Sequence, residues 1–278
     1  MEYIPCTKRL FPFKIDLITY YALYLRSLRH LCDRLGYQNI IPLWKNIFSQ
    51  YDNQFLMAVL SSRWQEVESG DTNKFETKVE ELITEFFPSP GSGLSAVEAR
   101  KIIDDTPPIR QVRQLFPNQM MIEKEIIAYD ALHIRFDGLA CLAEALIGKY
   151  GKQGELIAYD LMTESRLAAS QGETGSVEEF IEGFTSSSDT PSLFSAGLEM
   201  EVISKSAREA VVHVKECEWA RYFQDRHPQV GYLMACSTDE VAYKAFNPNL
   251  RMQRTGTIME GCDRCDFRIF TAAENLDQ

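Results

Sequence analysis

The spacing of apolar residues changes once along the chain, and this change limits the fold more than any other feature. Before residue 185 apolar side chains recur mainly at steps of three and four, as in helices, whereas from Leu198 onward they alternate with polar residues, as in half-buried strands. The chain is therefore predicted to be an α+β protein with helices packed on one face of a small antiparallel sheet and a helical N-terminal extension. The clearest helical stripe precedes Gly36 and consists of Ile18, Tyr21, Leu25, Leu28, Cys32 and Leu35.

The helical part is predicted to divide at its glycine- and proline-rich stretches. Residues 88–95 and 104–119 are predicted to be irregular, with at most a short helix between them. We expect residues 1–120 to form the extension and residues 121–278 to form the α+β domain. The helices are predicted at 18–35, 40–50, 54–66 and 74–87, then from near Met121 to Gly151 and at 155–170.

The sheet is predicted to consist of two hairpins that follow the Ser- and Pro-rich stretch 185–197. The first pairs residues 198–202 with 210–214 around the polar turn KSAR. The second pairs 251–260 with 265–270 around the turn GCDR, and short helices are expected between the hairpins at 217–226 and 238–245.

Charge and composition exclude several classes of partner. The net charge of -11 argues against nucleic acid and against an anionic membrane surface, because both bind clustered Lys and Arg. The sequence has no apolar run near the ~20 residues that span a bilayer, and its first residues do not resemble a secretory signal. We expect a cytoplasmic protein, and the sequence permits a homo-oligomer. Seven cysteines, an odd number in a long chain, fit reduced thiols, a metal site or a catalytic thiol better than a disulfide framework.

The segment 217–270 concentrates the chemically competent side chains. It contains four cysteines and His227 among arginine, aspartate, asparagine and threonine residues. The chain has no glycine-rich phosphate loop, nucleophile elbow or paired-histidine zinc helix, which argues against nucleotide binding and the commonest hydrolase classes. The ordered motifs of this segment are RHPxxGYL at 226–233, Cys236 with Asp239, FNP at 246–248, RTxT at 254–257 and GxxxCDF at 261–267.

With these motifs the segment resembles the L-2-amino-thiazoline-4-carboxylic acid hydrolase family. The resemblance implies hydrolytic opening of a cyclic isothiourea carboxylate, such as 2-aminothiazoline-4-carboxylate, to a carbamoyl-cysteine. It also implies a distant similarity of fold to the vinyl-reductase-associated domain and to TRAPP subunits, which place helices on an antiparallel sheet and lack this activity. Fold alone does not fix the reaction.

The residue types of this segment match the needs of such a reaction. Cys236 is a candidate nucleophile whose pKa His227 would lower if the two side chains meet. Asp239 or Asp266 is a candidate partner for the amidinium group. The remaining substrate-binding candidates are Arg254 for the carboxylate, and Asn247 and Thr257 for orienting water or the substrate amine.

Each candidate also has a purely structural interpretation. Asp239 follows Ser237 and Thr238 and is placed to cap a helix, and Asn247 precedes a proline and is placed to build a turn. His227 is predicted to lie at a helix end, where it would satisfy a carbonyl group. His133 is interpreted as a packing residue and kept in reserve as a base.

The sequence predicts no metal and no cofactor. Cys262 and Cys265 form one CxxC pair, but a structural zinc site usually needs two ligand pairs, so a reversible disulfide or simple packing is favoured. On a strand, Cys265 and Asp266 would point to opposite faces.

Three functions remain open. The favoured one is a hydrolase of the thiazoline-carboxylate type, a cytoplasmic enzyme of cysteine-related or secondary metabolism that acts on an amino-acid-derived carboxylate. The second is an enzyme of the same fold that performs a cyclisation or an elimination. The third is a non-enzymatic ligand-binding module, which the many polar side chains of residues 217–270 argue against.

Overall fold

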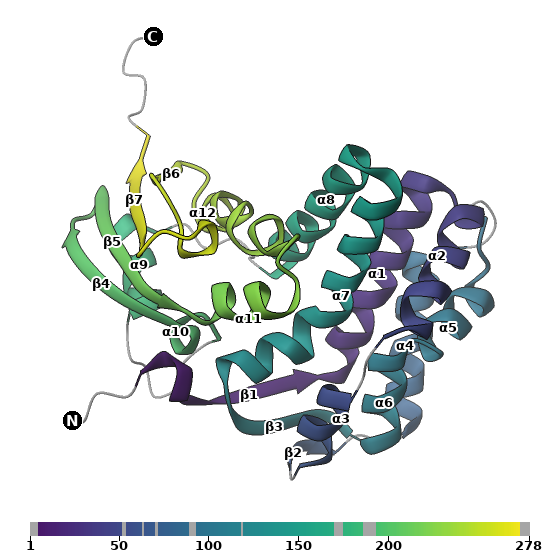
Figure 1. The fold of residues 1–278 in the computed structure, drawn as a ribbon. Helices are drawn as coiled ribbons and strands as arrows, with labels where there is room; N and C mark the ends of the chain where they lie inside the picture. Colours follow the sequence, from purple (N-terminus) through teal and green to yellow (C-terminus); the bar gives the residue numbers. More distant parts are fainter. Residues whose placement is uncertain are drawn as a thin grey trace. The chain divides into compact units, whose positions relative to one another are not determined.

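A computed structural model describes residues 5–272 except 52–53, 63, 70–71, 89–92, 118, 170–174 and 186–192. Figure 1 labels the helices and strands along the chain. Contacts between Cα atoms divide the chain into two compact units, each described by itself below. Unit 1 comprises residues 1–11, 126–132 and 158–278, and unit 2 comprises residues 12–125 and 133–157. The division expected at residue 120 stays a prediction.

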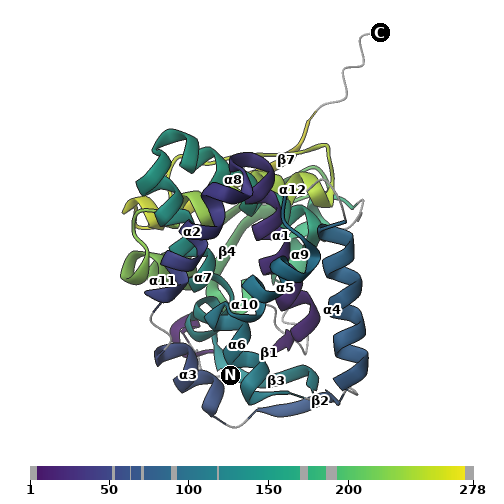
Figure 2. The ribbon, with the colours of Figure 1, turned by 90° about the vertical axis from the view of Figure 1, so that its right-hand side faces the viewer.

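Unit 2 is built around helix α1 (Leu17–Leu35), which confirms the first predicted helix. Its start is fixed by Asp16, whose carboxylate accepts the N–H groups of Ile18 at 2.9 Å and Thr19 at 3.2 Å. Its end is fixed by Gly36, which adopts a φ of +79° that other residues rarely reach. Helices α4 (Thr72–Phe86) and α5 (Ala96–Asp104) both contact α1 (Figure 2). Helix α2 spans Tyr37–Ser49.

A three-stranded sheet was not expected in this half of the chain. Its strands are β1 (Leu10–Asp16), β2 (Gln65–Ser69) and β3 (Gln119–Ile127), in the order β1-β3-β2. Two predictions are wrong as a result. Helix α3 (Gln54–Ser61) stops before β2, and the long helical block begins at Ala128 instead of near Met121. The buried Met120 and Ile122 alternate with less buried residues, which is the period of a strand.

The proline-rich stretch 104–119 is also more regular than predicted. Helix α6 (Pro107–Leu115) lies within it, because Pro107 and Pro108 occupy the first helical positions, where a missing N–H group costs nothing. The short helix expected before it is α5, which begins with a capping box between Ser95 and Glu98. Residues 89–92 of the predicted loop at 88–95 lie outside the described part of the chain.

Helices α7 (Ala128–Tyr150) and α8 (Lys152–Ala169) follow, separated by Gly151 as predicted. Gly151 has a φ of +56°, so the chain turns there without steric strain. Gly154 lets α8 start close to α7, because a Cβ atom at this position would lie 2.1 Å from the carbonyl oxygen of Leu146.

Among the described helices, none has the combination of length and apolar character that a membrane span requires.

Unit 1 contains the predicted antiparallel sheet. Its strands are β4 (Leu198–Lys205), β5 (Glu209–Cys217), β6 (Leu250–Gln253) and β7 (Cys265–Thr271), in the order β4-β5-β7-β6. The first hairpin is confirmed, with Leu198 opposite Cys217. In the second hairpin β6 is shorter than expected, and the turn contains the 3-10 helix η3 (Ile258–Glu260). Residues 186–192 of the Ser- and Pro-rich stretch lie outside the described residues.

Helices cover one face of this sheet, as predicted. Helix α9 (Val177–Thr185) packs against β4, β5 and β7, and helix α12 (Asp239–Phe246) packs against β6 (Figure 1). Helix α11 (Glu218–Arg226) confirms the other short helix. The remaining described elements of unit 1 are η1 (Cys6–Lys8), α10 (Leu193–Gly197) and the π-helical turn η2 (Tyr232–Cys236). The buried core between α9 and the sheet consists of Val177, Phe180, Ile181, Ala210, Val212, Leu250 and Ile269.

Candidate functional site

The π-helical turn η2 places Cys236 at the end of an unusually wide turn. The turn is closed by a hydrogen bond that spans five residues, in which the N–H group of Ser237 donates to the carbonyl oxygen of Tyr232 at 2.8 Å. The turn starts after Gly231, where a Cβ atom would lie 2.7 Å from Cβ of Phe223 and 2.8 Å from Sδ of Met259. Only glycine therefore fits without displacing its neighbours. Single π-helical turns are frequent at functional sites.

Arg254 is the centre of the polar group next to this turn. Its guanidinium donates to the Asp239 carboxylate at 2.8 Å, to the Cys236 carbonyl oxygen at 3.0 Å and to the Tyr232 hydroxyl at 3.1 Å. The rings of Tyr232 and Phe267 lie 5.5 and 5.8 Å from the guanidinium carbon. The side chains of Arg254 and Asp239 are only 10% and 16% exposed, so the ion pair is largely shielded from water.

The neighbours of Arg254 keep its guanidinium charged. Burial opposes the charge of Arg254, but the hydrogen bond to Tyr232 and the charge of Asp239 outweigh it and raise the pKa of Arg254. Asp239 is the first residue of α12, and the helix-capping position belongs to Thr238. The carboxylate of Asp239 binds Arg254. The capping interpretation did not include this role.

Cys236 is a protonated thiol in this arrangement. Burial, and then the charge of Asp239, raise the pKa of Cys236 from 9.0 to about 12, although Arg254 and a hydrogen bond with Thr257 act in the opposite direction. Attack by Cys236 thus requires removal of its proton during the reaction. His227 forms the C-cap of α11, where its N–H group donates to the Phe223 carbonyl oxygen at 2.7 Å, and its ring is buried. Its expected effect on Cys236 stays a prediction.

Thr257 and Asp266 organise the loop between β6 and β7. The buried Thr257 hydroxyl accepts the N–H group of Glu260 at 3.2 Å and donates to the Glu260 carboxylate at 2.8 Å. Asp266 accepts the N–H groups of Thr255 at 2.9 Å and Gly256 at 3.1 Å. Burial alone would raise the pKa of Asp266. These bonds and one from the Thr255 hydroxyl have the larger effect and lower the pKa below its ordinary value. The described side-chain hydrogen bonds of Asp266 all go to Thr255 and Gly256 of this loop.

Asn247 lies in the turn between α12 and β6 and ties this turn to the segment before α9. Its side-chain amide donates to the Gly175 carbonyl oxygen at 2.8 Å, and its side-chain oxygen accepts the N–H group of Asn249 at 2.9 Å. This arrangement matches the structural interpretation of the residue before Pro248. Among the sequence candidates, the structure thus joins Asp239, Arg254, Cys236 and Thr257 by contacts. The side chains of Asn247 and Asp266 instead bond to backbone groups that they hold in place.

The two cysteines of the CxxC pair lie in different environments. Cys262 is exposed, whereas Cys265 is buried and its Sγ atom accepts the N–H group of Ile258 at 3.3 Å. Burial raises the pKa of Cys265 above its ordinary value. This difference supports a packing role for Cys265.

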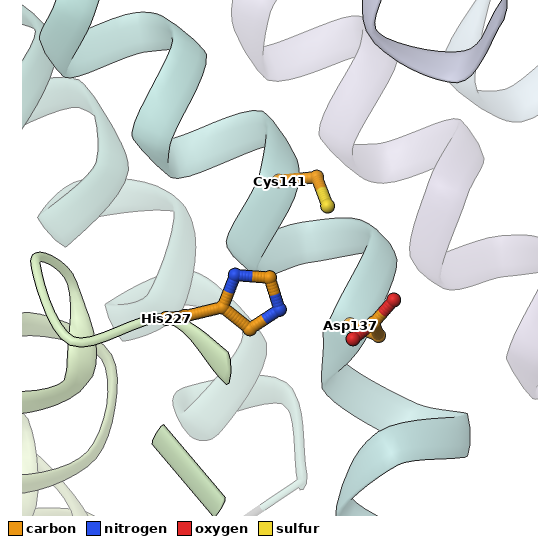
Figure 3. A group of neighbouring side chains, drawn as sticks. All are labelled: Asp137, Cys141 and His227. Carbon is orange, nitrogen blue, oxygen red and sulfur yellow. The ribbon is translucent and has the colours of Figure 1, made fainter. Parts of the chain in front are cut away.

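A second polar cluster, which sequence reasoning missed, lies on α7 within unit 2. We call His133, Asp137 and Cys141 the α7 cluster. Figure 3 draws Asp137 and Cys141 on α7, together with His227 of unit 1. His133 Nε2 lies 3.5 Å from Asp137 Oδ1, and these two side chains are only 1% and 3% exposed. The Asp137 carboxylate and the Cys141 Sγ atom lie within 4.8 Å of one another. Spacing by four residues was the available signal, because it puts the three side chains on one helical face.

Aromatic residues of unit 2 surround the α7 cluster. The Phe55 ring stacks on the His133 ring at a centroid distance of 4.1 Å. Burial, and then the Asp137 charge, raise the pKa of Tyr51, whose hydroxyl shares a hydrogen bond with Asp137. Tyr20 donates to the carbonyl oxygen of Ile134 at 3.0 Å. The cluster therefore contacts Phe55 of α3 and Tyr51, and Tyr20 of α1 bonds to the α7 backbone beside it.

Comparison with known proteins gives one match to a family and one to a solved structure. Residues 110–269 match the family described as L-2-amino-thiazoline-4-carboxylic acid hydrolase. The structural match is a mutant of the Fe(II) unliganded H-NOX protein from K. algicida, with 12% identity over 92% of this chain and 97% of that one. Its TM-score of 0.25 is too low to support any conclusion about fold or function. No curated protein matches the chain.

Proposed function

Because the chain belongs to the L-2-amino-thiazoline-4-carboxylic acid hydrolase family, we propose that it opens a cyclic amidine-like ring by hydrolysis. The proposed substrate is 2-aminothiazoline-4-carboxylate or a close relative, and the product is a carbamoyl-cysteine. Family membership supports a hydrolase at this general level. The identity of the substrate is our proposal.

The Arg254–Asp239 pair is the observation that carries the choice of substrate. A 2-aminothiazoline-4-carboxylate bears an amidinium-like group and a carboxylate, which are the charge opposites of Asp239 and Arg254. The pair is preformed, with 2.8 Å between the charged groups, and its shielding strengthens charge recognition. Contacts to Asp239, Cys236 and Tyr232 orient the guanidinium, which would attract a substrate carboxylate by its charge and its remaining N–H groups.

The proposed reaction adds one water molecule to the substrate. The carbon between sulfur and the ring nitrogen gains the oxygen atom, the bond from this carbon to the ring nitrogen breaks, and the nitrogen leaves as an amine after it takes a proton. The amidinium form makes this carbon electrophilic, and Asp239 stabilises that form. No cofactor takes part in this scheme.

The test is mass analysis of the products that purified protein forms from 2-aminothiazoline-4-carboxylate. We expect a product heavier by one water, and a rise in KM of ~10-fold or more for Arg254→Lys, which keeps the charge but loses the planar fork. Arg268→Lys is the matched control, because Arg268 pairs with Glu209 on an exposed part of the same sheet. No turnover by folded wild-type protein would contradict the proposed substrate and direct attention to a cyclisation, an elimination or a binding role.

A further inference from the structure

Tyr232 is the most exposed member of the polar group around Arg254. The residue is 40% exposed, whereas the side chains of Arg254 and Asp239 are 10% and 16% exposed. All three residues belong to unit 1, so the group lies within one compact part of the chain. A molecule in solution can therefore reach the Tyr232 side chain without any change of the fold.

The hydrogen bond between Arg254 and Tyr232 leaves the phenol proton available. Arginine has no acceptor atom, so its guanidinium donates and the Tyr232 hydroxyl oxygen accepts, at 3.1 Å. The phenol therefore keeps its own O–H group as a donor. Within the described part of the chain, no acceptor is bonded to this proton. The proton can thus be given to a molecule that enters the group.

Both ends of Tyr232 are held in place, although the residue is exposed. Its carbonyl oxygen accepts the N–H group that closes η2, at 2.8 Å. The Nη2 atom of Arg254 donates both to the Tyr232 hydroxyl and to the carbonyl oxygen of Cys236, so it joins the first and last residues of this turn. Burial lowers the pKa of Arg254, and the bond to Tyr232 is the largest of the effects that raise it. The hydroxyl is therefore preorganised, as a catalytic group must be.

The structure of the proposed substrate brings its ring nitrogen close to this hydroxyl. In 2-aminothiazoline-4-carboxylate the ring nitrogen and the carboxylate are attached to the same carbon atom. A carboxylate bound by Arg254 therefore places the ring nitrogen beside the groups that contact the guanidinium. The ionised Asp239 has no proton to give, and Cys236 offers its backbone carbonyl oxygen. Of the described groups bonded to the guanidinium, Tyr232 alone carries a proton that it can donate.

We propose that Tyr232 is the catalytic acid of the proposed hydrolysis and that its O–H group protonates the ring nitrogen as the bond to this nitrogen breaks. The inference rests on the proposed function, which requires a proton for the departing nitrogen, and it names the donor. Tyr232 lies in the motif RHPxxGYL but was not among the candidates chosen from the sequence. Tyrosine is one of the side chains that serve as general acids.

The reaction divides into two balanced steps. In the first, a water oxygen bonds to the carbon between sulfur and the ring nitrogen of the amidinium, and a proton of this water passes to Asp239. In the second, the bond from this carbon to the ring nitrogen breaks, and the nitrogen takes the Tyr232 hydroxyl proton. The remaining proton of the added oxygen passes to the Tyr232 oxygen as the carbonyl group forms.

Both residues end the reaction as they began it. Asp239 returns its proton to the released amine, which leaves as an ammonium group. Arg254, at 3.1 Å, stabilises negative charge that develops on the Tyr232 oxygen while its proton is transferred. The sum is the addition of one water molecule, and no electrons pass to an outside acceptor.

The first experiment compares wild type, Tyr232→Phe and Tyr129→Phe in the full chain with 2-aminothiazoline-4-carboxylate. We expect Tyr232→Phe to lose ~100-fold or more of kcat, with KM within about threefold of wild type and the same melting temperature. Tyr129→Phe is the matched control, because Tyr129 is also in unit 1 beside an arginine, with its ring 4.7 Å from the guanidinium carbon of Arg221. Wild-type kcat in Tyr232→Phe, or a change confined to KM, would overturn the inference and leave the proposed function standing.

The bond that breaks gives a second readout. A thiolate can leave without a proton, whereas an amine cannot, so loss of the acid favours breakage of the bond to sulfur. Breakage of the bond to nitrogen gives a product without a free thiol, which we expect for wild type. The residual activity of Tyr232→Phe should instead release a free thiol, which a thiol reagent detects. Release of a thiol by wild type would overturn the inference, although the product would still be heavier by one water.

An aromatic analogue separates this inference from the proposed reaction. 2-Aminothiazole-4-carboxylate keeps the carboxylate and a ring nitrogen that accepts a hydrogen bond, and its aromatic ring resists opening. We expect the ¹⁵N resonance of this ring nitrogen to differ between complexes with wild type and with Tyr232→Phe. Such a difference without turnover of the substrate would reject the proposed reaction and keep the donor. Equal resonances, or no binding to wild type, would overturn the inference.

Discussion

Replacing Arg254 by methionine tests the buried ion pair of unit 1. The two charged groups are 2.8 Å apart, which corresponds to ~6 kcal/mol of attraction at an effective dielectric constant of about 20. Desolvation offsets part of this attraction, but the variant leaves Asp239 shielded and without its cation, and breaking such a pair costs ~3 to 5 kcal/mol. Because both side chains keep some exposure, 10% and 16%, we expect the low end of that range.

The assay is urea unfolding of wild type, Arg254→Met, Asp239→Asn and the double variant. The double variant should lie within ~1 kcal/mol of wild type, since it leaves no uncompensated charge. Arg268→Met is the control, because the pair of Arg268 with Glu209 is 51% and 43% exposed and its loss should cost less than ~1 kcal/mol. If Arg254→Met and Arg268→Met destabilise the protein equally, the reasoning about shielding is wrong.

Three further predictions concern unit 1. The pKa of Cys236 is raised from 9.0 to about 12, so the folded protein keeps the thiol proton to a higher pH than the unfolded chain does. The stability that the protonated thiol contributes is therefore fully present below pH 9 and is lost as the pH rises toward 12. Unfolding curves that do not change with pH over this interval would contradict this prediction. Asp239→Asn removes the second cause of that shift, so alkylation of Cys236 should reach half its maximal rate at a lower pH than in wild type, and an unchanged profile would count against the coupling. Gly231→Ala should lower the free energy of unfolding by ~1 to 3 kcal/mol, because its Cβ atom would meet Phe223 and Met259. The control is Gly148→Ala, whose Cβ atom would meet nothing within 4 Å. Equal stabilities of the two variants would refute the steric argument.

Local signals in the sequence were enough for much of the fold. The stripe that ends at Gly36 predicted α1, and the alternation after Leu198 predicted the β4–β5 hairpin. The strand β3 was missed because the apolar run around Met121 has no clear period when its pairing partner is unknown. Helix α6 was missed because its two prolines were interpreted as breaks instead of as a helix start.

The candidate site was predictable by residue type but not by contact. Sequence reasoning chose Arg254 and Asp239 separately, and only the fold shows that they bind each other. It interpreted His133 as a packing residue and kept it only in reserve as a base, because one histidine on an apolar helix is usually a packing residue. The structure shows that His133 has a buried carboxylate partner, Asp137. Asp137 is buried by residues that lie far away in sequence, such as Tyr24. Burial of this kind is a tertiary property.

The most direct test of the account follows the reacting carbon itself. Substrate labelled with ¹³C between sulfur and the ring nitrogen would be incubated with wild-type protein in ¹⁸O water and observed by ¹³C NMR and mass spectrometry. The account predicts that the amidine signal is replaced by a carbamoyl signal and that the product carries one ¹⁸O atom. Persistence of the amidine signal with folded protein, or a product without ¹⁸O, would contradict hydrolysis.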